Sequence, residues 1–261
     1  MTDDEIFYKL ALHKYNHLRK YFRARVPRLL KKYDIDPSNP KEGLIRFGKA
    51  RLHPILPEEC EIIPRSEWDL DGLVGQTEKQ LLHPHYETIM KYIYDNHQKK
   101  NDVLVIFECS NSKPYSHSHI LKTNFIDKFS DQCDFAVMSN PGVIPMEYSN
   151  YYPYRYDEWD HSRETPEIVE RYVEVNIQRT LSYVSHFGYK HVFVMMQHPH
   201  TQKLFDKMWN ENIGGCRDWM TIVTNDEFRE RYNQEYFPIL KNKGLCISRM
   251  MNSNLLRDHF K

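Results

Sequence analysis

Short apolar runs that alternate with longer amphipathic segments limit the fold of this chain more than any other feature. Strand-like runs occupy residues 103–107, 134–138, 191–196, 219–223 and 245–248. Helical patterns separate or flank them at residues 77–97, 118–129, 165–187, 201–212, 224–243 and 254–260. This alternation predicts an α/β fold, a three-layer sandwich in which helices cover both faces of a mostly parallel central sheet.

The segment before residue 77 does not show this alternation of strands and helices. We expect a helix to about Ala24, a break at Pro27, and then a loop-rich connector over residues 34–75, where prolines and glycines are frequent. The predicted organisation is therefore a basic helical N-terminal extension with its connector, residues 1–76, followed by an α/β core, residues 77–261.

Positive charge is concentrated at the start of the chain. Residues 1–33 hold nine Lys or Arg against three acidic residues, a net charge of +6, which leaves the rest of the neutral chain at −6. Such segregation predicts a polyanionic partner, and the interspersed aromatic rings can stack on unpaired bases. The alternative is a solvated basic helix whose aromatic residues pack on the core. The residues predicted to bind RNA are Lys14, Arg19, Lys20, Arg23, Arg25, Arg28, Lys31 and Lys32.

Composition excludes several classes of protein. No stretch approaches 18 apolar residues, so no membrane span is expected, and the N-terminus lacks the pattern of a signal peptide. The chain has five cysteines, which is an odd number, and it has no CxxC pair. This spacing argues against a disulfide framework or a zinc knuckle and favours a reducing, cytoplasmic location. No metal or organic cofactor is predicted.

The strand at 103–107 ends in a polar turn that carries most of the reactive side chains. In open α/β sheets, chemistry collects at the carboxyl ends of strands. The turn reads Glu108-Cys109-Ser110-Asn111-Ser112-Lys113-Pro114-Tyr115-Ser116-His117-Ser118-His119. The alternative is an ordinary loop in which Cys109 is a small buried hydrophobe.

This turn resembles the core motif of the archaeosine synthase family, in which Pro-Cys is followed by Lys-Pro-Tyr, a serine and a histidine. Cys109, Lys113, Pro114, Tyr115 and Ser118 match it by spacing. Two positions depart from it, because Glu108 replaces the proline and the histidine is His119, two residues before the family's position, which is Leu121 here.

A second block strengthens the resemblance, which covers roughly residues 82–225. Ser139, a Gly-hydrophobic-Pro turn that begins at Gly142, and Glu147 are followed by Tyr152-Pro153 and Tyr156-Asp157, in the family's order and spacing. The family implies a fold similar to uracil-DNA glycosylase. It also implies conversion of the nitrile of 7-cyano-7-deazaguanine in tRNA to an amidine, with an amino-group donor such as lysine or glutamine. The resemblance also implies a radical-SAM partner, which completes the lysine route in some lineages, or a transglycosylase-like partner in place of the domain that is usually attached.

The residue types fit this chemistry. Cys109 is the candidate nucleophile, and Lys113 could lower its pKa or instead orient the base while the amine attacks directly. Asp157 or Glu147 could deprotonate the incoming ammonium, and Tyr115 or Ser116 could donate to the imide nitrogen. Asp157 could also be a loop cap and Glu147 an ordinary surface glutamate. The predicted substrate-binding residues are Ser110, Ser116, Ser118, Ser139, Gly142, Glu147 and Tyr156.

The sequence allows alternative interpretations of three further features. The tyrosines between 148 and 156 could stack on bases or could pin their loop by packing. The His-Pro-His triplets at 83–85 and 198–200 could bind a metal or could mark helix starts. The chain could be a non-catalytic RNA-binding subunit, or a glycosylase-like base-processing enzyme, in place of a synthase.

Overall fold

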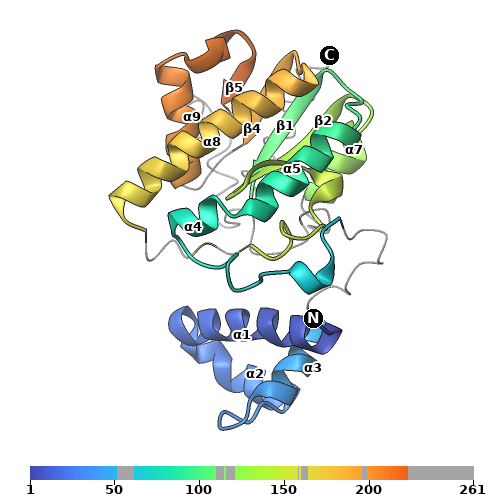
Figure 1. Cartoon of the computed structure of the whole chain (residues 1–261), viewed down its shortest axis with the longest axis vertical. Coiled ribbons are helices and arrows are strands. Elements are labelled where there is room, and N and C mark those ends of the chain that lie inside the picture. Colours follow the sequence, from blue (N-terminus) through green and yellow to red (C-terminus); the bar gives the residue numbers. More distant parts are fainter. Residues whose placement is uncertain are drawn as a thin grey trace, which may run out of the picture.

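The structure, a computed structural model of the 261-residue chain, describes residues 1–51, 62–109, 115, 121–157, 159, 164–195 and 199–222. Its core is a five-stranded sheet with the strand order β3-β2-β1-β4-β5 (Figure 1). The strands are β1 (Val103–Glu108), β2 (Cys133–Ser139), β3 (Gly142–Pro145), β4 (His191–Met195) and β5 (Met220–Ile222). All neighbouring pairs are parallel except β2 and β3, which are antiparallel. The predicted α/β class and mostly parallel sheet are confirmed.

The middle strand, β1, has one core on each side. Leu104 and Ile106 belong to a large hydrophobic cluster on one face, and Val105 and Phe107 to a smaller one on the other. All four side chains are buried. Because side chains alternate along a strand, a strand buried on both faces needs a continuous apolar run, which is what residues 103–107 supply.

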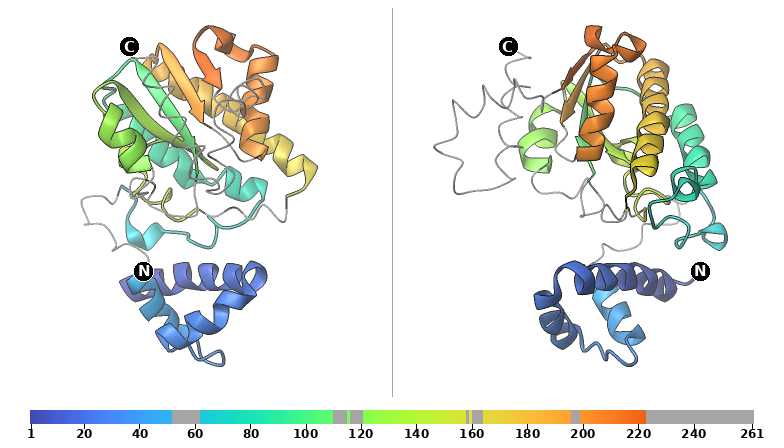
Figure 2. Two further views of the ribbon diagram at one scale, coloured as in Figure 1. Left: turned by 180° about the vertical axis from the view of Figure 1, so that it is seen from behind. Right: turned by 90° about the vertical axis from the view of Figure 1, so that its left-hand side faces the viewer.

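Helices cover both faces of the sheet (Figure 2). On the face of the large cluster lie α4 (Glu78–Leu81), α5 (Pro84–Asn96), α8 (Pro166–Phe187) and α9 (Pro199–Asn210). The other face holds the π-helical turn η5 (Lys122–Ile126) and α7 (Asp127–Phe129), whose Phe125 and Phe129 enter the smaller cluster. A 3-10 segment, η8 (Ile213–Asp218), links α9 to β5.

Local signals in the sequence account for the helix boundaries. The Thr165 hydroxyl accepts the Ile168 N–H at the start of α8, and Gly188 ends that helix in the left-handed conformation. Pro84 restarts a helix after α4, so the helical pattern predicted for residues 77–97 is two helices. The elements predicted beyond residue 222 lie outside the described residues.

The sequence analysis missed β3, which falls in a stretch expected to be irregular. The strand has four residues, ends in Pro145 and pairs with β2 from Ser139↔Gly142 to Ala136↔Pro145. So short a run carries too little alternation to be recognised. It reverses the chain direction directly after β2 and carries the chain back along the sheet.

The N-terminal segment is a compact helical unit, which we define as residues 1–51. It comprises α1 (Asp3–Tyr21), the short 3-10 turn η1 (Arg23–Arg25), α2 (Val26–Tyr33) and α3 (Lys41–Arg51). Its small core is formed by Ala11, Tyr15, Ile35, Leu44 and Phe47.

Two predictions for this unit were wrong. Pro27 does not break a helix but lies in the first turn of α2, where a missing N–H costs nothing. Helix α3 was expected to be loop because Gly43 and Gly48 read as breakers. A Cβ at Gly43 would lie 2.7 Å from the Ile35 Cα, and one at Gly48 would lie 2.7 Å from the Phe7 carbonyl oxygen. These glycines therefore permit close helix packing.

The helical unit is joined to the core through the segment 62–76. Ile6 of α1 belongs to the same hydrophobic cluster as Ile63 and Trp68. Lys9 pairs with Asp71 at 2.5 Å, and Arg65 pairs with Asp3 at 2.5 Å.

Among the described helices none is long and apolar enough to cross a membrane.

We predict that Gly142→Ala destabilises the protein more than Gly188→Ala. Gly142 has φ +109°, and a Cβ there would lie 3.1 Å from the Arg179 Cβ, whereas Gly188 has φ +62° and open space around it. The expected losses in free energy of unfolding are roughly 2–3 kcal/mol and about 1 kcal/mol, measured by urea denaturation. Equal losses would show that the Arg179 contact and the backbone at Gly142 impose no special constraint.

Candidate functional site

The predicted nucleophile lies at the carboxyl edge of the sheet. Cys109 directly follows β1, and its N–H donates to the Met138 carbonyl at 3.0 Å, which extends the β1–β2 ladder by one bond. Ser139 is the last residue of β2. Because β1 and β2 are parallel, the turn after one strand lies beside the turn after the other.

A buried carboxylate organises this edge. Asp157 is 1 % exposed and accepts hydrogen bonds from Ser139 Oγ at 2.9 Å and Asn140 Nδ2 at 3.0 Å. The Tyr115 hydroxyl lies 3.2 Å from Ser139 Oγ. Since the Ser139 proton points to Asp157, Tyr115 is the donor to Ser139. The result is a hydrogen-bonded chain from Tyr115 through Ser139 to Asp157.

Two more tyrosines border this chain. Burial raises the pKa of Tyr115 and of Tyr172 well above the usual value, and the charges of Asp157 and Cys109 raise both further. The hydroxyl of Tyr172, on α8, is hydrogen-bonded to Thr201 of α9. Burial, followed by the charge of Asp157, also raises the pKa of Tyr86 on α5. All three phenols are therefore neutral hydrogen-bond donors at neutral pH.

Tyr86 has a spare donor within this group. It is fully buried, and its hydroxyl has no hydrogen-bond partner within the described part of the chain. A buried hydroxyl without a partner is costly, so its persistence beside a carboxylate is typical of a position where water or a ligand completes the bonding.

The turn that holds Ser139 and Asn140 is fixed from α8. Arg179 donates to the Leu81 carbonyl at 3.0 Å, pairs with Glu87 at 2.7 Å and reaches the Asn140 carbonyl at 3.5 Å. Its stem packs against Gly142. The glycine is therefore explained by close packing, while its predicted role in substrate binding stays a prediction.

The connections after β1 and β4 diverge at this edge. The connection from β1 runs through η5 and α7 on one face of the sheet, whereas the connection from β4 runs through α9 on the other face. Strands β1 and β4 are neighbours. Connections that leave adjacent parallel strands toward opposite faces define a topological switch point, where α/β proteins bind their ligands.

Five residues of the turn after β1 lie outside the described residues, namely Ser110, Lys113, Ser116, Ser118 and His119.

The departure at Glu108 does not put a carboxylate beside the thiol. Glu108 is the last residue of β1 and, by strand alternation, shares the face of Leu104 and Ile106. Cys109 packs against the cluster on the opposite face, with Val105 and Phe107. The two side chains therefore project to different sides of the sheet.

Glu147 is not brought together with the other predicted residues. The antiparallel β3 returns the chain toward the amino edge, where Glu147 Oε1 lies 3.1 Å from Nδ1 of His97, the residue that follows α5 and precedes β1. Burial raises the pKa of Glu147, but hydrogen bonds from His97 and the backbone outweigh it and hold the pKa below its usual value. The structure thus gives Glu147 an ion pair at the far edge.

The tyrosines after β3 serve largely as packing residues. Tyr152, Tyr154 and Tyr156 are all buried, and Tyr152 stacks on Trp68 with ring centroids 4.6 Å apart. Tyr156 packs on the same indole at 5.3 Å. Of the two alternatives for this cluster, the packing role is the one these three side chains fulfil. Substrate contact by Tyr156 stays a prediction.

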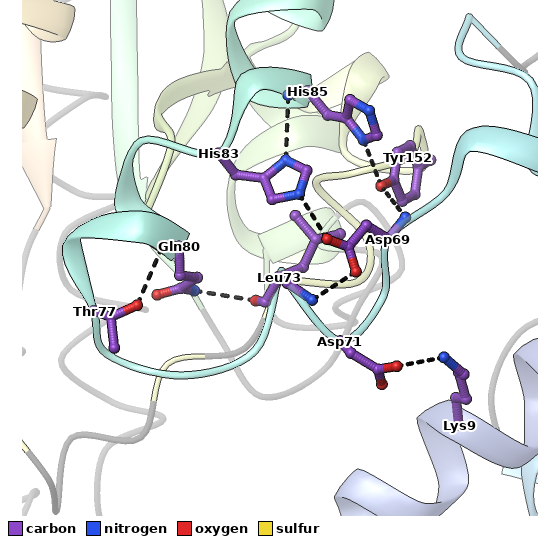
Figure 3. Close-up of polar contacts among 10 residues, drawn as sticks. Lys9, Asp69, Asp71, Leu73, Thr77, Gln80, His83, His85 and Tyr152 are labelled. Atoms are coloured by element: carbon purple, nitrogen blue, oxygen red, sulfur yellow. Dashed lines mark hydrogen bonds and ion pairs between the residues drawn. The ribbon is translucent and has the colours of Figure 1, made fainter.

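The first His-Pro-His triplet marks a helix start (Figure 3). His83 Nδ1 accepts the His85 N–H, so its Nε2 carries the proton and faces Asp69 Oδ2 at 3.4 Å. The Tyr152 hydroxyl accepts the Asp69 N–H at 2.8 Å and is hydrogen-bonded to His85 Nδ1 at 2.7 Å. This network ties the segment 62–76 to α5. In the described ranges, no cluster of three or more His, Cys, Asp or Glu side chains could hold a metal ion.

Sequence reasoning missed Asn140, Tyr172, Thr201 and Tyr86. Tyr172 reads as one more residue on the buried face of α8. The signal that could have found it is its place in the first turns of a helix that precedes a parallel strand. Such a helix runs antiparallel to the strands, so its N-terminal turns lie at their carboxyl edge.

A family model described as "Domain of unknown function (DUF5591)" matches residues 84–225, more than half of the chain, so the chain belongs to this family. No curated protein matches it. A solved structure, "Crystal structure of AF0587, a protein of unknown function", is 16 % identical with a TM-score of 0.38, and the match covers 60 % of this chain and 50 % of that one. That similarity is too weak to support a conclusion about fold or function.

We predict that Ser139→Ala lowers the free energy of unfolding by about 1–3 kcal/mol, because Tyr115 and Asp157 each lose a buried hydrogen-bond partner. Ser149→Ala is the matched control. Ser149 is also fully buried, but its hydroxyl has no partner in the described residues, so its removal is expected to change stability by less than about 0.5 kcal/mol. Thermal or urea unfolding measures both, and equal losses would contradict the inferred chain.

A pH titration tests the placement of Glu147. Its pKa is depressed in the folded state, so its ionised form adds stability above the unfolded pKa, and that contribution disappears as pH falls through the folded pKa. We expect Glu147→Gln to be less stable than the parent near pH 6 and equal to it near about pH 3. The difference should not exceed about 1 kcal/mol, because the Glu147 side chain is 51 % exposed. A difference that does not change with pH would contradict the ion pair.

Proposed function

We propose that this member of the DUF5591 family is an archaeosine-synthase-like enzyme that converts the nitrile of 7-cyano-7-deazaguanine in tRNA to an amidine. One observation carries the proposal. Residues from both motif blocks, Cys109 and Tyr115 from the first and Ser139 and Asp157 from the second, meet at one edge of the sheet, beside a switch point. Side chains that only maintain a loop need not gather a thiol, a phenol and a buried carboxylate.

The reaction requires a nucleophile, a proton donor and a base. In the proposed route the Cys109 sulfur adds to the nitrile carbon, forming a C–S bond while the nitrile nitrogen takes a proton, to give a thioimidate. The amine donor then forms a C–N bond to the same carbon, and the C–S bond breaks to return the thiol. The product is an amidine, and no oxidant or reductant is consumed.

The buried hydroxyl and carboxylate suit the two proton transfers. Tyr115, kept neutral by burial and by the nearby carboxylate, donates to the imide nitrogen when its O–H turns from Ser139 toward the substrate. Asp157 accepts the proton that the donor ammonium must lose before it can attack. The chain from Tyr115 through Ser139 to Asp157 connects the two sites. Once Tyr115 has given its proton to the substrate, both hydrogen bonds of the chain reverse, and the proton taken by Asp157 returns to Tyr115 through Ser139. Direct attack by the amine on the nitrile, with Lys113 orienting the base, is the alternative route.

The proposal includes the partners that the resemblance implies. These are tRNA, lysine or glutamine as amino-group donor, and a radical-SAM or transglycosylase-like partner protein. It also includes a cytoplasmic location and a core similar to uracil-DNA glycosylase. The helical unit supplies affinity for RNA in this scheme, through the basic residues of α1, η1 and α2.

A second candidate function is a non-catalytic RNA-binding subunit. It is favoured by the position where the family has its histidine, which is Leu121 in this chain. Leu121 is 2 % exposed and packs in the smaller hydrophobic cluster. A side chain so placed contributes to the core and supplies no imidazole at this position, so the histidine of the family motif is replaced here by a packing residue.

We expect nitrile-bearing tRNA, incubated with the full chain and labelled lysine, glutamine or ammonia, to gain the labelled group, as measured by nucleoside mass spectrometry. Cys109→Ala should abolish the product, and Asp157→Asn should slow its formation by about 10²–10⁴-fold. Cys133→Ala is the control. Burial in the core raises the pKa of the Cys133 thiol to about 12, so that variant should retain turnover if it folds.

Two outcomes would redirect the proposal. Absence of product with intact tRNA binding would favour the non-catalytic subunit. Full activity of Cys109→Ala would exclude the thioimidate route and leave direct attack by the amine. Circular dichroism of each variant separates loss of the reaction from loss of the fold.

A further inference from the structure

The helical unit has a hollow where α1 meets α2. Its volume is about 550 Å³, large enough for a nucleotide, and it lies on the outside of the unit. The residues that line it are Asn16, Arg19, Lys20, Arg23, Val26 and Pro27. Three cations thus line the hollow together with Val26 and Pro27, which is a composition suited to a phosphate and a base together.

Positive charge around this hollow is dense. Arg19, Lys20, Arg23 and Arg25 are exposed, and no acidic residue occurs between Ile6 and Tyr33. Phosphate groups are therefore the natural counter-charges for this corner.

An aromatic ring lies among these cations. Phe22, at the end of α1, is 41 % exposed, and the Arg25 guanidinium lies 4.8 Å from the centre of its ring. In the described part of the unit it is the one large apolar side chain with that exposure. An exposed ring next to a guanidinium is a platform on which an unpaired base can stack.

The apolar side of α2 packs against the core of the helical unit. Val26, Leu29, Leu30 and Tyr33 of α2 pack against the core formed by Ala11, Tyr15, Ile35, Leu44 and Phe47. A helix that binds a membrane surface needs an apolar face to insert between lipids. With that face partly buried against the core of the unit, the exposed corner presents cations and the Phe22 ring, which suits a nucleic acid strand better than a bilayer.

We propose that the corner formed by the end of α1, η1 and the start of α2 binds an unpaired segment of RNA. Arg19, Lys20 and Arg23 hold its phosphates, and Phe22 stacks on one base. The inference rests on the proposed tRNA substrate and gives it a second point of contact, distinct from Cys109 and Asp157. The carboxyl ends of the strands point toward the side of the core on which the helical unit lies, so one RNA molecule can contact both (Figures 1 and 2).

The test compares two full-length variants of equal charge change. Arg19→Gln/Lys20→Gln/Arg23→Gln alters the corner, and Lys91→Gln/Lys128→Gln/Lys207→Gln alters three exposed lysines of the core. Fluorescence anisotropy measures binding to unmodified tRNA and to a single-stranded oligoribonucleotide over a salt series. The first variant should lose at least about tenfold in affinity near 100 mM salt, with a salt slope about 2 units shallower. The second should stay within about twofold of the parent.

A substitution at Phe22 isolates the stacking. Phe22→Ala should weaken binding to the single strand by about tenfold, Phe22→Trp should retain it, and a duplex of equal length should be insensitive to both. Equal salt slopes for the two triple variants would overturn the proposal. So would binding to vesicles rich in anionic lipid that depends on the corner while RNA binding does not. Loss of nitrile turnover with this binding intact would refute the proposed reaction and leave the RNA site standing.

Discussion

The central position of β1 is the constraint on which the rest of the structure depends. Its residues are buried on both faces, and both of its edges are paired, with β2 on one side and β4 on the other. A strand with no exposed face must be apolar until its last residue and must then become polar abruptly. That transition places Cys109 at the sheet edge, and the divergence of the connections after β1 and β4 makes this edge a topological switch point.

The polar groups at this edge hold one another in place through hydrogen bonds. A buried carboxylate is costly unless hydrogen bonds compensate it, and Asp157 receives them from Ser139 and Asn140. Those donors are in turn held by β2, by Tyr115 and by the contact of Arg179 with the turn. The carboxylate thus has a fixed position relative to the strand ends, which is a requirement for proton transfer.

Much of the fold was predictable because its signals are local. The apolar runs of β1, β2, β4 and β5 and the cap at Thr165 can be read without tertiary information. Helix α3 and strand β3 could not be predicted, since Gly43 and Gly48 serve packing between helices and β3 is only four residues long. The reversal of the chain at β3 also explains why Glu147 lies apart from the other predicted site residues. Spacing grouped Glu147 with Asp157, but an antiparallel strand separates residues that are ten positions apart by sending one to each edge of the sheet.

The distribution of charge divides the chain into a basic start and an acidic remainder. Residues 1–33 carry a net +6 and the remaining residues a net −6, so the part of the chain that holds Cys109 and Asp157 repels a polyanion on average. A large anionic substrate therefore needs a separate cationic surface to offset that repulsion. The helical unit has such a surface, and Lys9, Asp71, Ile6 and Trp68 connect it to the core. In the proposed function, binding energy gained at that surface positions the reacting group at the strand ends.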